Sequence, residues 1–234
     1  AFPAVGVLSA AAAWAAAGNP ADTLYRAELS TDSFASLVNS SDTFGLSAVF
    51  GSGGQGANLE PDRRYHVRVR ASSGAVTTGY NPLGSATTLA QEPASPALGA
   101  LGLSSASLSW SANSNPASTR YEAQLSTDAF ATVNSSSLTF GTSAAFTTLS
   151  QNTTYHLRVR GANSAGVATA FAASVTTVTF AAAPSSSAFS GPGVSSITAS
   201  WGANGNPVGT NWRIELSTDS FATTNLSLTT TSIS

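Results

Sequence analysis

Few side chains in this chain could do chemistry, and those that could recur at fixed intervals. His66 and His156, the only histidines, stand in the matching segments Tyr-His-Val-Arg-Val-Arg and Tyr-His-Leu-Arg-Val-Arg. They occupy one equivalent position in two separate segments, so they cannot converge on one metal ion or one catalytic triad. A zinc site needs three or four converging ligands, and the chain has no cysteine to supply them. We expect no catalytic residue, no metal site and no cofactor.

Three aspartates also recur, each in the tripeptide Ser-Thr-Asp: Asp32, Asp128 and Asp219. A calcium ion needs six to eight oxygen ligands, usually from several carboxylates close together. One aspartate per segment falls short of that number. We expect each carboxylate to cap a turn by accepting hydrogen bonds from nearby backbone, with the phenylalanine two residues later anchoring the strand.

Arginines alternate with apolar residues along the two matching segments: Arg68, Arg70, Arg158 and Arg160. In a strand, alternate residues share one face, and we expect this face to be exposed beside Glu28 in the first segment and Glu122 in the second. One interpretation is a contact surface for carboxylated glycans or a partner chain. The other is cross-strand ion pairing worth a few tenths of a kcal/mol per pair, which we favour.

A glycine-rich stretch over 51–58 gives a second candidate contact surface. It includes Gly53 and Gly54 and is longer than the matching stretch further along the chain. Glycine-rich loops are flexible, and loops on rigid scaffolds often carry binding. A tolerated surface insertion is the alternative that we favour.

The elements that position these residues repeat with the length of a whole domain. Three tryptophans, at spacings of 96 and 91 residues, mark the phase: Trp14, Trp110 and Trp201. Asn-Pro pairs mark the same phase: Asn19-Pro20, Asn115-Pro116 and Asn206-Pro207. Such a period is too long for a solenoid turn and suits small domains. We predict modules over 1–92, 93–181 and 182–234, joined by short proline-containing linkers that make a semi-rigid string.

The third predicted module is incomplete, because the Tyr-x-x-Arg-Val-Arg segment does not recur in it. Half a sandwich exposes an apolar face and an open sheet edge. Two explanations stay open: a longer natural chain completes the module, or a neighbouring subunit donates the missing strands by strand addition.

Hydropathy along each module alternates with period two. In the second module Ala106, Leu108 and Trp110 alternate with serines, and Tyr155, Leu157 and Val159 alternate with histidine and arginine. This pattern, interrupted by Gly, Pro, Asn and Ser, is typical of antiparallel sandwiches with one buried face per sheet. We predict an all-β fold of tandem β-sandwiches.

Composition excludes two classes of partner. Charged residues are 9% of the chain and the net charge is −2, which provides no basic surface for nucleic acid or anionic lipid. No apolar run is long enough to span a bilayer, so we expect no membrane insertion in this segment. A surface with so little charge resists self-association poorly. The composition therefore favours a protein that assembles with other molecules.

At the level of motifs, the chain resembles tandem fibronectin type III domains. In the second module the resemblance rests on Trp110, the Tyr-Glu-Ala-Gln-Leu segment at 121–125, and Leu149 six residues before Tyr155. In the first module it rests on the Leu-Glu-Pro segment at 59–61 followed by Tyr65. The resemblance implies immunoglobulin-like sandwiches. Tyr65 and Tyr155 would then be corner tyrosines with buried rings, and Trp14, Trp110 and Trp201 would fill the cores.

A sandwich of this type hosts many roles, so the resemblance leaves function open. Our first hypothesis is a non-catalytic extracellular or cell-surface repeat protein, bacterial in origin, within a filament, sheath or adhesin. Its partners would be further copies of itself or other surface proteins and glycans. The alternative is a set of spacer modules in a large secreted enzyme such as a polysaccharide hydrolase. A binding module of its own would need exposed aromatic residues, for which Tyr80 and Phe180 are the candidates.

Overall fold

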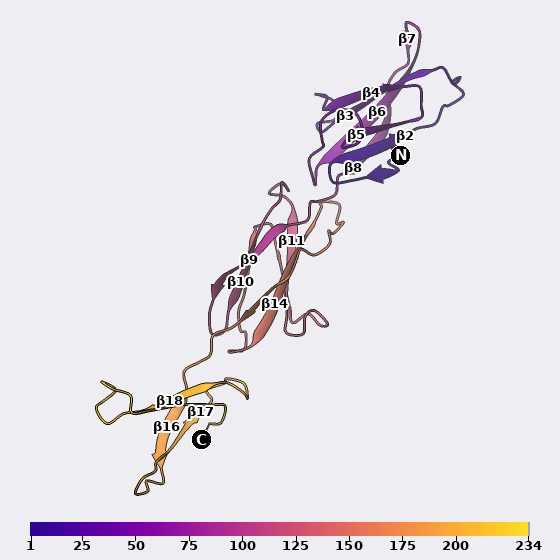
Figure 1. Ribbon diagram of the computed structural model, residues 1–234. Helices are drawn as coiled ribbons and strands as arrows, with labels where there is room; N and C mark the ends of the chain where they lie inside the picture. Colours follow the sequence, from indigo (N-terminus) through magenta and orange to yellow (C-terminus); the bar gives the residue numbers. More distant parts are fainter. Residues whose placement is uncertain (234) are drawn as a thin grey trace.

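The chain forms a row of three β-modules (Figure 1). The computed structural model describes residues 1–233, and over that range it consists of strands and loops without a helix. Within this part of the chain there is accordingly no helix that could cross a bilayer. The modules follow one another end to end, with the termini in the first and the third module (Figure 1). The predicted fold class, a tandem array of all-β sandwiches, is confirmed.

Two sheets build the first module. The first sheet has the order β1-β2-β5, with bounds Ala4–Val5, Ser9–Ala13 and Ser47–Gly51. The second has the order β4-β3-β6-β7, and β8 also pairs with β6. The strands of this second sheet are β3 (Leu24–Ser30), β4 (Asn39–Thr43), β6 (Arg64–Ser73), β7 (Val76–Thr77) and β8 (Asn81–Thr87). All described pairings between these strands are antiparallel. An isolated bridge between Phe50 and Gln55 is parallel.

The second module repeats this plan. Its first sheet has the order β13-β10-β9, with bounds Ser143–Phe146, Ala106–Ser111 and Ala94–Leu101. Its second sheet has the order β12-β11-β14-β15, with bounds Ser135–Thr139, Arg120–Ser126, Thr154–Ala162 and Val175–Val178. The central pair β11 and β14 is in register over seven residues, which places Gln124 opposite Arg158 and Glu122 opposite Arg160.

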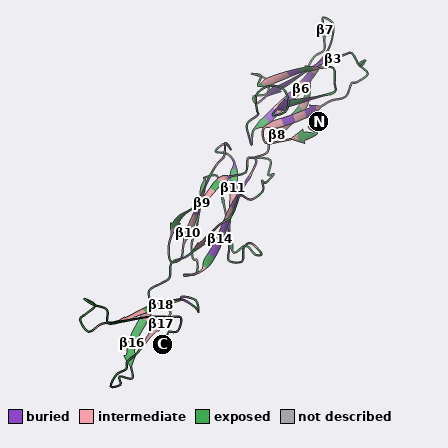
Figure 2. Cartoon of the chain, viewed as in Figure 1, coloured by how far each residue is buried: buried purple, intermediate pink, exposed green. Residues whose placement is uncertain are grey.

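Each of these two modules has a separate core between its sheets (Figure 2). The inward residues of β10 and β14 in the second module are those that the alternating pattern predicts, including Leu108 and Leu157. Trp110 belongs to this core, whereas Trp14 packs against the first core while half-buried. Because each core is closed within one module, a module does not depend on its neighbour for apolar burial.

The two corner tyrosines have buried rings and hydrogen-bonded hydroxyls. Tyr65 Oη accepts a hydrogen bond from the Glu60 amide at 2.9 Å, and Tyr155 Oη accepts one from the Ser150 amide at 2.9 Å. Burial raises the pKa of Tyr65. Each hydroxyl therefore ties the loop before β6 or β14 to the strand itself.

We expect Tyr155→Phe to lower the free energy of unfolding of the second module by about 1 kcal/mol, because the Ser150 amide loses its acceptor. Chemical denaturation of the full chain measures this change. Tyr25→Phe is the control, since the hydroxyl of Tyr25 makes only long contacts of 3.3 and 3.4 Å. Equal losses for the two variants would contradict the corner assignment.

The third module consists of two strand pairs. β16 (Ser185–Ser190) pairs with β17 (Thr198–Gly202), and β18 (Trp212–Leu216) pairs with β19 (Leu226–Thr230). Among the described residues, β18 has no second neighbour, whereas its counterparts β3 and β11 are paired on both edges. Trp201 is half-buried, in edge-on contact with Trp212. Much of this module is consequently exposed (Figure 2).

Candidate functional site

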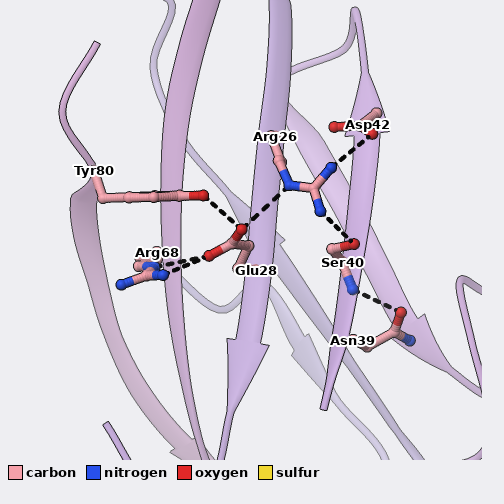
Figure 3. A network of polar contacts seen from close by, with 7 residues as sticks. All are labelled: Arg26, Glu28, Asn39, Ser40, Asp42, Arg68 and Tyr80. Carbon is pink, nitrogen blue, oxygen red and sulfur yellow. Dashed lines mark hydrogen bonds and ion pairs between the residues drawn. The ribbon is translucent and has the colours of Figure 1, made fainter. Parts of the chain in front are cut away.

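The arginine face of the first module is organised around one buried carboxylate (Figure 3). Glu28 on β3 is 3% exposed and lies opposite Arg68 on β6. Arg68 donates to Glu28 Oε2 from Nε at 2.9 Å and from Nη2 at 2.7 Å, and the Tyr80 hydroxyl donates to Oε1. Arg26 Nε donates to Oε1 at 3.2 Å as the fourth donor group. Burial alone would raise the pKa of Glu28, but the bonds from Tyr80, Arg68 and Arg26 outweigh it and lower the pKa.

Aromatic rings cover the same arginines. The Arg68 guanidinium carbon lies 4.3 Å from the ring centre of Phe34 and 3.9 Å from that of Tyr80. Arg70 lies 4.9 Å from the Tyr80 ring. A cation held over a ring within about 6 Å gains roughly 0.5–2 kcal/mol. The first module therefore carries a ladder of alternating aromatic rings and guanidinium groups.

The second module carries the same ladder with different side chains. Arg158 lies 3.9 Å from the ring centres of both Phe130 and Phe171, and Arg160 lies 4.5 Å from that of Phe171. Arg160 Nη2 pairs with Glu122 at 2.7 Å, whereas Arg158 donates to the neutral Gln124 at 2.7 Å and 3.0 Å.

The ladders decide what this face can do chemically. Glu28 pairs with Arg68 and Glu122 with Arg160, as the ion-pair interpretation predicts. The interpretation is wrong for Arg158, which bonds to Gln124, and for Arg70, which has no ion pair among the described residues. Aromatic rings cover the faces of all four guanidinium groups. Tyr80, a candidate exposed aromatic, is instead bonded to Glu28, whereas Phe180 is exposed. Sequence reasoning missed the stacking of Phe34 and Phe130, for which the phenylalanine of Ser-Thr-Asp-x-Phe was the available signal.

The Ser-Thr-Asp aspartates hold one turn in each module. Asp128 accepts hydrogen bonds from the Thr132 amide at 2.9 Å, the Thr132 hydroxyl at 2.7 Å and the Ser126 hydroxyl at 2.7 Å. The same three donors reach Asp32 from Ser36 and Ser30, and Asp219 from Thr223 and Ser217. The predicted capping therefore takes the form of a loop in which the aspartate carboxylate is bonded to the residue four positions later.

These bonds give the turns a defined response to acid. The bonds from Thr132 and Ser126 lower the pKa of Asp128 from 3.8 to about 2, and Asp32 and Asp219 behave alike. A lowered pKa stabilises the folded chain fully above about pH 4, and the contribution disappears as the pH falls through about 2.

We expect a triple variant, Asp32→Asn with Asp128→Asn and Asp219→Asn, to lose less melting temperature than the unmodified chain between pH 4 and pH 2. The measurement is the melting temperature as a function of pH. Asp22→Asn is the control, and an unchanged slope in the triple variant would contradict the assignment.

The two histidines stay apart, as their equivalent positions predict. His156 Nδ1 lies 2.9 Å from Thr176 Oγ1, and its ring meets the edge of Phe130. His66 holds the matching place on β6. Over residues 1–233, no three His, Cys, Asp or Glu side chains gather in a way that could hold a metal ion.

The glycine-rich loop folds back on the first module. The backbone N–H of Gln55 donates to Val49 O at 2.8 Å, and a Cβ at Gly54 would meet the same oxygen at 2.2 Å. Asn39 also donates to Gln55 O. Gly53 is different, because a Cβ there would meet nothing within 4 Å. The loop therefore needs glycine at 54 for close packing and exposes Gly53.

The junction between the first two modules is a further polar site. Asn115 pairs with the backbone of Gln91, accepting from its amide at 2.7 Å and donating to its carbonyl at 2.7 Å. Across the junction, Asp62 accepts from the Thr119 hydroxyl at 2.7 Å and from the Ser164 amide at 2.6 Å. Asp62 is 5% exposed and Thr119 is fully buried.

The second junction uses the equivalent residues. Asn206 pairs with the backbone of Ala182 through two bonds of 2.9 Å. Asn152 stands in the place of Asp62 and donates to the Thr210 hydroxyl at 2.8 Å. Asp62 and Asn152 have φ of 46° and 44°, a left-handed conformation in which Asp and Asn are enriched among non-glycine residues. The Asn-Pro repeat was the sequence signal for this site, but it did not indicate the contacts.

A family model and the solved structure of tenascin domains agree with this fold. The model of the fibronectin type III domain family matches residues 93–178. Among solved structures, a two-domain fibronectin type III segment of chicken tenascin is 14% identical, with a TM-score of 0.52, and the match covers 76% of this chain and 97% of that one. The FN1-FN3 domains of chicken CNTN1 are 15% identical, with a TM-score of 0.35, over 75% of this chain and 64% of that one. No curated protein matches.

Proposed function

Because the chain consists of tandem fibronectin type III-like modules, we propose that it is a non-catalytic structural protein of the cell exterior. It would act as a stiff element of a surface filament, sheath or adhesin, assembled through module-to-module contacts. Modules of this family are typically extracellular structural or adhesive units, and this general role is the starting point of the proposal.

The observation that carries the proposal is the repeated junction. In a flexible string, linkers between modules would be free of side-chain contacts. Here each linker backbone is held by an asparagine of the next module, and each loop before the corner tyrosine reaches across to a threonine. Two junctions that share the asparagine and threonine contacts would repeat one relative orientation along the array, which is what a stiff fibre requires.

Small-angle X-ray scattering of the full chain tests the stiffness. We expect the pair-distance distribution of an elongated particle, unchanged between low and moderate salt because the junction bonds are short-range. The profile of modules that reorient freely would contradict the proposal. Exterior placement is tested separately, by antibody labelling of intact source cells; labelling that requires permeabilised cells would contradict it.

A further inference from the structure

At its N-terminal end, here called the N-terminal pole, the first module has the same asparagine and threonine that contact the preceding module at the two junctions. Its Asn19-Pro20-Ala-Asp-Thr23 segment aligns with Asn115 to Thr119 and with Asn206 to Thr210, which hold the preceding module. The backbone turn is also the same, since the Thr23 amide donates to Pro20 O as the Thr119 amide does to Pro116 O.

At this pole the two junction side chains lack the partners that their counterparts have. Thr23 is 6% exposed, and its hydroxyl has no hydrogen-bond partner among the described residues. Asn19 donates to the Tyr25 hydroxyl at 3.3 Å but pairs with no linker backbone in residues 1–233. Both side chains line an open depression of about 550 Å³, together with the loop residues Ser73 and Gly74. In the second module, the corresponding loop supplies the Ser164 amide to Asp62.

We propose that this pole binds the loop of a further module of the same kind, and that this loop carries asparagine rather than aspartate. The choice rests on Asp22, which lines the depression beside Thr23. The two occupied junctions have Ser118 and Gly209 at this position. A carboxylate in the place of Asp62 would meet the like charge of Asp22, whereas an amide in the place of Asn152 would donate to Thr23 as Asn152 does to Thr210.

The pole differs from the occupied ones at two further positions. Ala17 stands where Asn113 and Asn204 donate to the linker carbonyls of Glu92 and Ala183. Ser73 stands where Asn163 donates to Thr88 O. The proposed contact therefore depends on Asn19 and Thr23, which makes these two residues the ones to change.

A four-module chain tests the proposal, which rests on the proposed stiff array. Residues 93–187 are fused ahead of the full chain, because Ala188 aligns with Ala1 and the second module has its own closed core. The chain has no cysteine. Two introduced cysteines, one on either side of a chosen junction, are therefore the only sites that a thiol-reactive spin label can modify. The label-to-label distance distribution is measured across the new junction and, as the internal reference, across the native junction between Asp62 and Thr119.

We expect one narrow distance peak across the new junction, like that of the reference. Asn19→Ala with Thr23→Val should abolish the narrow peak, and so should Asn152→Asp in the added copy. Asp22→Ser should restore it in the Asn152→Asp background. A broad distribution at the new junction beside a narrow reference would overturn this inference alone, as would a narrow peak that survives Asn19→Ala with Thr23→Val. A narrow peak that survives Asn152→Asp would overturn the preference for asparagine. Broad distributions at both junctions would overturn the stiff array itself.

Discussion

Replacing Trp110 with alanine is expected to lower the free energy of unfolding of the second module by about 3–5 kcal/mol. Trp110 is 6% exposed in the core, and its ring centre lies 5.6 Å from that of Tyr121 in a tilted arrangement. Deleting the indole removes this contact and leaves a cavity between the sheets. Since single domains are stable by only about 5–15 kcal/mol, the variant would lose a large part of its stability.

Chemical denaturation of the full chain measures the loss. Each unfolding transition is assigned to the module whose tryptophan variant shifts it. Trp14→Ala is the matched control, because Trp14 has the equivalent position but is half-buried. Trp110→Phe should cost less than Trp110→Ala, since it keeps a ring and removes the indole N–H, which has no hydrogen-bond partner. Equal losses for Trp110→Ala and Trp14→Ala would contradict the account of the core.

Replacing Asp62 with alanine is expected to uncouple the first two modules. The change leaves the Thr119 hydroxyl and the Ser164 amide without acceptors. Leaving the fully buried Thr119 hydroxyl unpaired costs about 1–3 kcal/mol. The cost should appear as a loss of coupling between the two modules, while each core remains intact, because the two cores are separate.

Asp62→Asn is the matched control, since the second junction functions with Asn152 at this position. Hydrogen exchange at the Ser164 amide measures the coupling. We expect strong acceleration in Asp62→Ala and less in Asp62→Asn. Unchanged exchange in Asp62→Ala would show that the carboxylate does not hold the junction.

The strands and the fold class were predictable because they depend on local alternation. Leu108 and Leu157 face the core as period two requires. The turn chemistry at Asp128 was predictable for the same reason, because its partners lie within four residues.

The site contacts were not predictable, because they join residues distant in sequence. Asp62 and Ser164 are 102 positions apart and lie in different modules. Arg158 on β14 meets Phe130, which lies in the loop after β11 with a φ of 71°. Glu28, expected to be exposed, is buried because Tyr80 closes over it.

The measurement that tests the central claim most directly is the spin-label distance distribution across the first junction of the full chain. The account predicts one narrow peak, which the combined Asn115→Ala and Asp62→Ala changes broaden without unfolding either module. A broad distribution in the unmodified chain would contradict it, because the asparagine, aspartate and threonine contacts would then not fix the modules.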